Sequence, residues 1–284
     1  MGQPTLIYQA LKYWDFVQYV TGTEVDDSCY FAVQGLSSLQ VRNNNWDLGV
    51  SWEEAVEMGT SGWSKATNSL HKIRASNESV MDLGAPSYEW DVVGIMPDIP
   101  EFLSGEPDCM INWSEEAATP IVRIGLEGSY SAGNSGDYAV NLGGALLSLI
   151  DALECAGYMV ELTVAFRGIG EGIAVNTDII VKTTDEYTDV SRVGYAVAHP
   201  AFFRKLYFRY LELLDTKHQE MLGSGYGRPG EGDPDDFDIS IPAPDQHTSR
   251  TAEMALKTVM KAAGLTRCGK WSPFSFSWSC SSNF

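Results

Sequence analysis

One short stretch of the chain combines an acid with two hydroxyl groups at regular spacing. In VRIGLEGSYSAGNS, residues 122–135, an apolar run ends at Glu127, and Ser129 and Ser131 follow at alternate positions. Mg²⁺ takes oxygen ligands, and a strand, an oxygen-rich loop and a helix in succession are a common way to hold it. We interpret Glu127, Ser129 and Ser131 as a metal site or its degenerate remnant. The alternative is a serine-rich turn whose hydroxyls bond the local backbone.

A second stretch has the residue types that hold single-stranded nucleic acid. In HPAFFRKLYFRYLELLDTKH, residues 199–218, the cations Arg204, Lys205 and Arg209 alternate with phenylalanine and tyrosine. Cations can contact the phosphates of such a strand while aromatic rings stack on its bases. The alternative is an amphipathic helix whose rings lie in the core while its arginines extend into solvent.

The C-terminal segment KWSPFSFSWSCSSNF, residues 270–284, has a third such pattern. Aromatic residues alternate with serine from Phe274 to Ser279, which is typical of a strand with one apolar face. This strand could pair with an edge of its own sheet or of a partner's sheet. It could also stack on bases, with Arg267 and Lys270 on the phosphates. The candidate stacking residues are Trp271, Phe274, Phe276 and Trp278.

No set of residues with a catalytic signature is present in the sequence. The four histidines have no metal-binding spacing, and no G-x-S-x-G motif occurs. We therefore expect a protein that is not an enzyme and needs no cofactor, with Mg²⁺ the one ion to consider. The rival hypothesis is a metal-dependent hydrolase or nuclease that uses Glu127 and nearby acids.

Composition narrows the class of protein. A chain of 284 residues with 44% hydrophobic residues predicts one folded domain with extensions. The net charge of −19 disfavours non-specific nucleic-acid binding, although a local basic patch remains compatible with it. Five widely spaced cysteines without a C-x-x-C pair suit a reducing cytoplasm. We see neither a signal peptide nor a membrane span, and we expect a cytoplasmic protein of an infected bacterial cell.

The predicted elements alternate from residue 120 onward. Strands are expected at 121–126, 158–166, 173–184 and in FDISIPAP, with helices at 143–157, 190–200, 201–218 and 249–264. Upstream, SWEE at 51–54 has a capping-box pattern, PDIPEFLSG predicts a helical turn that ends at Gly105, and Val92–Val93 suggest a short strand. Such alternation predicts an α/β fold with a mainly parallel sheet flanked by helices.

The segment from Pro120 to Gly264 resembles von Willebrand factor A-type domains. The resemblance is carried by a strand, the D-x-S-x-S pattern and a helix, with Glu127 standing where the family has aspartate. It implies an acid and two serines on Mg²⁺, joined by a threonine and an aspartate from other loops. Thr183, Thr184, Asp185 and Asp189 have the right types, although nothing in the sequence assigns them to those loops. The longer Glu127 side chain puts the metal geometry in doubt.

A narrower resemblance covers most of residues 46–264. The pieces SWEEAVEMGTSGWSKA, SGEPDCM, PIVRI, LIDALECAGYMVEL and VAHPAFFRKLYFRYLELL resemble a group of phage and bacterial proteins. This implies a phage or mobile-element origin and brings no established activity. In overall size and character the chain is also similar to the single-stranded-DNA-binding cofactor that serves the middle RNA polymerase of schitovirus-type phages.

These observations lead to one expected organisation and function. We expect a mostly helical N-terminal extension over residues 1–118, a von Willebrand A-like (Rossmann-like) core over 119–264 and an aromatic and serine tail over 265–284. We expect a phage-type transcription cofactor that contacts single-stranded DNA and an RNA polymerase. The metal-dependent hydrolase and a protein-adhesion module with a degenerate metal site are the alternatives.

Overall fold

The structure is a computed structural model of the chain. It describes residues 4–25, 29–35, 37–39, 45–64, 89–94, 96–112, 121–223, 225–230 and 237–265.

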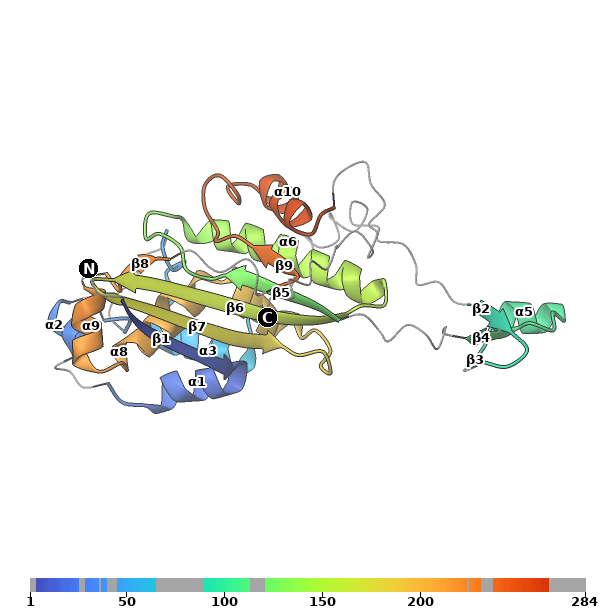
Figure 1. Cartoon of the computed structure of the whole chain (residues 1–284), viewed down its shortest axis with the longest axis horizontal. Helices are drawn as coiled ribbons and strands as arrows, with labels where there is room; N and C mark the ends of the chain where they lie inside the picture. Colours follow the sequence, from blue (N-terminus) through green and yellow to red (C-terminus); the bar gives the residue numbers. More distant parts are fainter. Residues whose placement is uncertain are drawn as a thin grey trace, which may run out of the picture.

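The main body is built on a six-stranded sheet (Figure 1). Its strand order is β1-β7-β6-β5-β9, and the short strand β8 pairs with β6. The pairs β1/β7, β5/β6 and β5/β9 are parallel, and β6/β7 and β6/β8 are antiparallel. The bounds are β1 Thr5–Lys12, β5 Ile121–Glu127, β6 Met159–Gly170, β7 Ile173–Lys182, β8 Arg228–Pro229 and β9 Ile239–Ile241.

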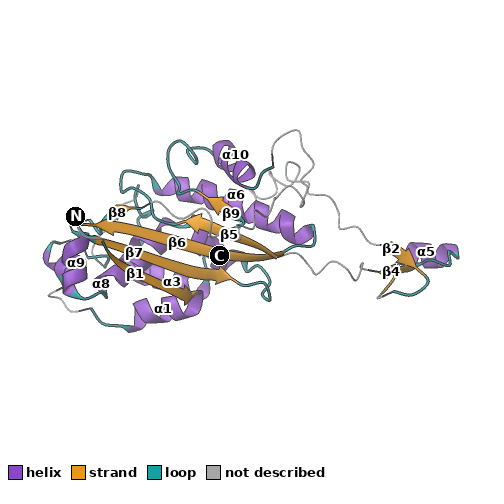
Figure 2. Cartoon of the chain, viewed as in Figure 1, coloured by secondary structure: helices purple, strands orange, loops and turns teal. Residues whose placement is uncertain are grey.

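Helices pack against this sheet, and several pass behind the strands in the view of Figure 2. The bounds are α1 Tyr13–Gly22, α2 Tyr30–Val33, α3 Trp52–Ser61, α6 Gly136–Cys155, α7 Val190–Ala198, the π-helix η1 Phe202–Tyr207, α8 Phe208–Glu212, α9 Thr216–Leu222 and α10 Ala252–Ala262.

A smaller unit lies between undescribed segments and is drawn at the right of Figure 1. It has a three-stranded antiparallel sheet of order β2-β4-β3 and one short helix. The bounds are β2 Glu89–Asp91, β3 Met96–Pro97, α5 Ile99–Ser104 and β4 Met110–Asn112.

Local sequence explains why these elements form where they do. In β7 the side chains from Ile173 to Val181 alternate between buried and half-buried, because successive residues of a strand point to opposite faces of the sheet. The α3 helix begins at a complete capping box, in which Ser51 accepts from the Glu54 N–H and Glu54 accepts from the Ser51 N–H. Gly105, the residue after α5, has a left-handed backbone conformation. Glycine adopts this conformation readily and is therefore common at helix ends.

The α/β fold class predicted from the sequence is confirmed, and so are most of the predicted elements. Four details differ. The predicted helix 201–218 is divided among η1, α8 and α9, and α6 begins seven residues before the predicted 143. The predicted strand at Val92–Val93 is instead β2, which ends at Asp91. Strand β1 was not predicted, and it joins residues 5–12 to the sheet of the predicted core.

The α6 helix is long and apolar enough to cross a membrane by length and composition. Its apolar window is 61% buried inside the protein, as expected of a core helix. It packs against α7 and α10. Among the described residues no other helix passes this test.

The contact between α6 and α7 predicts a mutational effect at Gly143. A Cβ atom at this position would lie 2.4 Å from the Ala198 Cβ and 2.6 Å from the Val197 carbonyl oxygen. We expect Gly143→Ala to lower the free energy of unfolding by about 1–3 kcal/mol, because overpacking forces the two helices apart. Chemical denaturation measures this. Gly22→Ala in α1 is the control, since nothing lies within 4 Å of its Cβ, and it should leave stability unchanged or slightly raised.

Candidate ligand pocket at the carboxyl ends of the central strands

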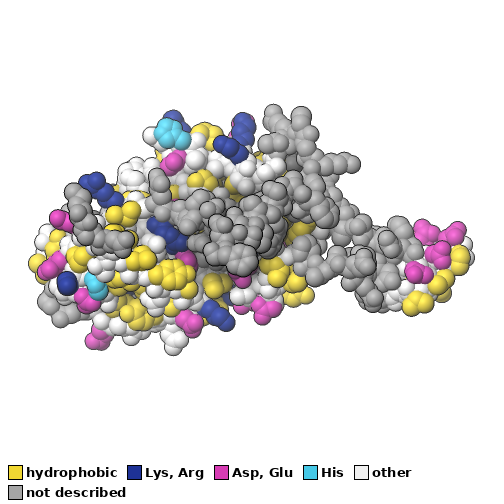
Figure 3. All heavy atoms as spheres, viewed as in Figure 1, with side chains coloured by type: hydrophobic (Ala, Val, Ile, Leu, Met, Phe, Trp, Pro, Cys, Tyr) yellow, Lys and Arg dark blue, Asp and Glu magenta, His cyan; other side chains and the backbone are white. Residues whose placement is uncertain are grey.

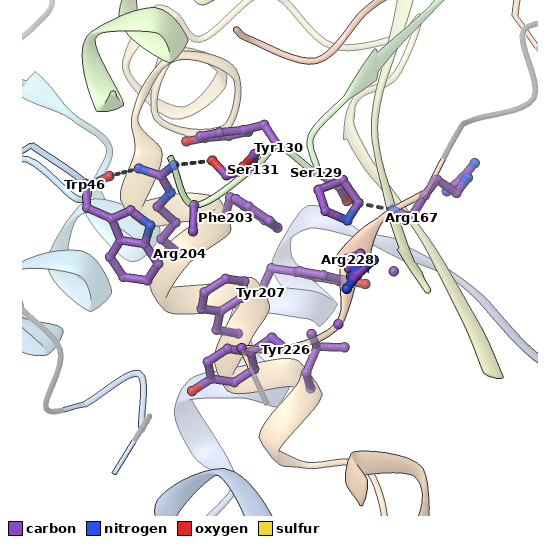
Figure 4. Close-up of a pocket in the computed structure, with 17 residues that line it drawn as sticks. Trp46, Ser129, Tyr130, Ser131, Arg167, Phe203, Arg204, Tyr207, Tyr226 and Arg228 are labelled. Atoms are coloured by element: carbon purple, nitrogen blue, oxygen red, sulfur yellow. Dashed lines mark hydrogen bonds between the residues drawn. The ribbon is translucent and has the colours of Figure 1, made fainter. Parts of the chain in front are cut away.

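A pocket of about 230 Å³ lies where β5 and β6 end (Figure 4). In α/β sheets ligands bind at this edge. The loop after β5, the end of β6, the π-helix and the loop around β8 form its walls, and Trp46 comes from the N-terminal part of the chain. Its aromatic side chains are Trp46, Tyr130, Phe203, Tyr207, Phe208 and Tyr226, and its arginines are Arg167, Arg204 and Arg228.

The Arg204 guanidinium fixes one wall of the pocket. It lies 4.9 Å from the ring centre of Trp46 and 4.5 Å from that of Tyr130. It donates to the carbonyl oxygens of Trp46, Ser131 (3.1 Å) and Asn134 (2.8 Å), as Figure 4 shows for the first two. The side chain is 0% exposed, and burial lowers the pKa of Arg204 below its usual value. Arg204 therefore joins the Trp46 loop, the β5 loop and the π-helix.

The π-helix sets the spacing of the rings beneath the pocket. A π-helix closes hydrogen bonds over five residues rather than four, and such segments recur at functional sites. Tyr207 stacks on Phe166 of β6 with ring centres 4.1 Å apart. The ring centre of Phe203 lies 4.9 Å from that of Tyr130. These contacts form a continuous aromatic layer between the helix and the sheet.

The loop from 225 to 229 closes the opposite side. Gly225, Tyr226 and Gly227 all have positive φ, which is rare for tyrosine. Tyr226 is held there by stacking on Phe208 at 4.1 Å and by donating its hydroxyl to Glu212 at 2.6 Å. This places the exposed Arg228 at the rim of the pocket, in register with Ile169 of β6.

Glu127 lies beside the pocket in an unusual environment. Its Oε1 accepts from the Ser129 N–H at 2.9 Å, and in the described structure its buried Oε2 has no hydrogen-bond partner. Burial raises the pKa of Glu127 to about 7, opposed by the Ser129 hydrogen bond and the charge of Arg167. A carboxyl in this environment holds its proton near neutral pH.

Both serine hydroxyls of the predicted metal site accept hydrogen bonds from backbone N–H groups. Ser129 Oγ accepts from the Arg167 N–H at 2.7 Å, and the exposed Ser131 Oγ accepts from the Gly133 N–H at 3.3 Å. No cluster of three His, Cys, Asp or Glu side chains able to hold a metal occurs among the described residues. The Arg167 guanidinium, whose charge acts on Glu127, would repel a cation. These residues do not fit a preformed Mg²⁺ site, and Mg²⁺ binding stays an untested prediction.

The four further residues named for the metal shell do not join Glu127. Thr183 donates to Asp185 at 2.5 Å in the turn after β7, where Asp185 is exposed. Asp189 is the N-cap of α7 and accepts from the N–H groups of Ser191 and Arg192. Thr184 follows Thr183 in the same turn. Local hydrogen bonds account for these polar groups.

The predicted phosphate-binding cations of the helix are interior residues. Lys205 is 1% exposed, donates to the Ser38 carbonyl oxygen and pairs with Asp47 at 3.4 Å. Arg209 pairs with the buried Glu212 at 3.2 Å. Like Arg204, the side chains of Lys205 and Arg209 do not extend into solvent. In this conformation none of the three is available to a phosphate backbone. Burial of a cation needs such partners, which for Lys205 come from distant segments and for Arg209 include the neighbouring Glu212.

The remaining predicted nucleic-acid residues lie outside the described part of the chain. They are Arg267, Lys270, Trp271, Phe274, Phe276 and Trp278.

Sequence reasoning missed several residues of the pocket, among them Trp46, Tyr226 and Arg228. Trp46 lies in the asparagine-rich NNNWDLG, and Tyr226 and Arg228 lie in the glycine-rich GSGYGRPGEG. An aromatic and a cationic residue between glycines was the available signal, because glycine lets a backbone approach a ligand closely.

Comparison with known proteins identifies the family. A family model described as a domain of unknown function, DUF7192, matches residues 8–267. The chain belongs to this family. No curated protein and no solved structure matches it. The family description carries no activity, so the von Willebrand A-like and phage-cofactor resemblances stay predictions.

The buried Arg204 predicts a stability effect. We expect Arg204→Lys to lower the free energy of unfolding by roughly 2–4 kcal/mol, because an ammonium cannot reproduce the planar fork that reaches three carbonyl oxygens. Arg228→Lys is the matched control and should leave stability unchanged, since Arg228 is exposed. Urea denaturation measures both, and equal stabilities for the two variants would contradict the role of Arg204.

Glu127 predicts a pH dependence of stability. Its folded pKa of about 7 lies above the unfolded value of 4.5. Its contribution is therefore complete below about pH 4.5 and is lost as pH rises through about 7. Relative to Glu127→Gln, we expect the natural protein to lose on the order of 2 kcal/mol between pH 5 and 8. The measurement is denaturation at several pH values, and parallel curves for the two proteins would exclude the raised pKa.

The hydrogen-bonded serines and the nearby Arg167 predict how the protein responds to Mg²⁺. We expect neither Mg²⁺ nor Mn²⁺ to raise the melting temperature, because the serine hydroxyls are engaged and Arg167 opposes a cation. Differential scanning fluorimetry with metal and with chelator measures this. A metal-dependent rise that Ser129→Ala removes would restore the metal-site interpretation.

Proposed function

We propose that the protein is a non-enzymatic binding protein that holds single-stranded DNA, with one unpaired base in the Arg204 pocket. As a transcription cofactor it also contacts an RNA polymerase. The observation that supports the proposal is the lining of the pocket, with six aromatic side chains and an exposed arginine at the rim.

The chemistry of the pocket suits an unpaired nucleotide. Aromatic side chains stack on bases with about 1–3 kcal/mol per base, and every base has a face to stack. Bases of a duplex are not available for this, whereas bases of a single strand can be turned outward. Arg228, which lines the pocket and is exposed, would contact the phosphate of the same nucleotide, while Arg204 shapes the wall from inside the protein.

The strongly negative net charge of the protein favours a DNA contact made by a few residues over one made by a broad surface. At a net charge of −19 the protein as a whole repels DNA, so binding must come from a small number of groups. Among the described residues, five cationic side chains are buried, namely Arg167, Lys182, Arg204, Lys205 and Arg209. The proposal therefore differs from the sequence hypothesis in its residues, with Arg228 and the pocket rings replacing the cations of the helix.

The polymerase contact is supported by the sequence resemblance alone. A cofactor that holds single-stranded DNA beside a polymerase would need a separate surface for protein.

Fluorescence anisotropy with a labelled oligothymidine tests the proposal. We expect binding at about 50 mM salt that weakens at about 200 mM. Arg228→Glu should weaken binding about tenfold or more and reduce the salt slope by about 0.7, the value for one phosphate contact on a single strand. The control is Arg250→Glu, an equal charge change at an exposed position outside the pocket, and it should have a much smaller effect.

Two outcomes would contradict the proposal. In the first, the natural protein does not bind the oligonucleotide at either salt concentration. In the second, both charge reversals weaken binding equally, which would make the effect one of net charge rather than of the pocket.

A further inference from the structure

The small unit of residues 89–112 carries only acidic charges. Its sequence contains six acids, Glu89, Asp91, Asp98, Glu101, Glu106 and Asp108, and no lysine, arginine or histidine. Asp91, Glu106 and Asp108 are exposed. In Figure 3 the coloured part of this unit, at the right, shows acidic and hydrophobic side chains and no basic ones.

The same unit exposes large apolar side chains. Val92, Val93, Ile99, Phe102 and Leu103 are between 57% and 77% exposed. Within the described structure no residue of α5 is buried, although Ile99, Phe102 and Leu103 have the i, i+3, i+4 spacing of one helical face. Clustered exposed apolar residues with a polar rim mark interaction sites on soluble proteins.

Local features of the backbone fix both ends of α5. The Asp98 N–H donates to the Cys109 carbonyl oxygen at 2.8 Å, which attaches the start of α5 to the strand that follows it. The helix ends at Gly105 in a left-handed conformation. Pro97 and Pro100 restrict the backbone on either side of the helix start. The helix therefore keeps its apolar face without help from a core.

We propose that residues 89–112 form a docking surface for a protein that presents an apolar groove rimmed by lysine and arginine. The apolar face of α5 enters the groove, as in helix-in-groove recognition, and the surrounding carboxylates meet the basic rim. Naming an RNA polymerase as that partner rests on the proposed function.

Charge distinguishes this partner from other occupants. Six carboxylates without a cation repel a phosphate backbone, so the surface does not suit nucleic acid. A second copy of the chain would bring a net charge of −19 against this acidic unit. Several cations of the main body are already paired, as in Arg123–Asp238, Arg192–Glu186 and Lys257–Glu253.

The test uses the full-length chain and the purified RNA polymerase of the genome that encodes it, with affinity measured by biolayer interferometry. We expect the double variant Phe102→Ser and Leu103→Ser to weaken binding by about tenfold or more, and raised salt to weaken binding by the natural protein. The control is Tyr187→Ser, which removes an aromatic ring that is 98% exposed elsewhere and should leave affinity unchanged. Melting temperature and oligothymidine binding should be the same for all variants.

Each result decides the proposal. Loss of polymerase binding in the double variant, with DNA binding retained, supports it. Equal binding by the double variant and the natural protein overturns it, and so does the absence of polymerase binding by the natural protein. The oligothymidine measurement then judges the DNA-binding part of the proposed function separately. Sedimentation velocity tests whether a second copy of the chain occupies the surface instead. A dimer that the double variant abolishes would assign the surface to a second copy and overturn the proposal of a basic partner.

Discussion

The buried guanidinium of Arg204 is the interaction on which the pocket depends. It satisfies three carbonyl oxygens from two loops that are distant in sequence, and two aromatic rings cover its faces. A charge in the interior is costly unless it is paired in this way, so the loops, the π-helix and the end of β5 must adopt one arrangement together. The pocket is the space that this arrangement leaves at the edge of the sheet.

Several cations of the chain are paired inside the protein rather than exposed on its surface. Lys182 donates to the Val160 carbonyl oxygen, Arg167 pairs with Asp178, and Arg209 pairs with Glu212. Because Arg167 and Arg209 are each paired with an acid, the excess of 38 acids over 19 bases lies in the rest of the chain and makes the protein acidic. Under the proposed function, recognition of single-stranded DNA would depend on the aromatic rings of the pocket and on Arg228 rather than on a broad positive surface.

The sequence predicted the framework better than the site. The apolar run before Glu127 and the capping box at Ser51 are local patterns, and local patterns determine strands and helix starts. The burial of Arg204 depends instead on carbonyl groups 70 to 158 positions away, which no local pattern contains. An aromatic helix with cations has the same sequence pattern whether its cations face solvent or backbone, and the π-helix further changes which residues share a face.

The parallel pairing of β1 with β7 has a consequence for biosynthesis. The ribosome makes Tyr8 170 positions before its hydrogen-bond partner Asp178. Until β7 is synthesised, residues 5–12 lack the strand with which they pair, and Leu6 and Tyr8 remain open to other contacts. The edge of the sheet is therefore completed late, and such long-range closure slows folding relative to helical proteins of similar size. Residues 5–12 are therefore synthesised well before the strand with which they pair.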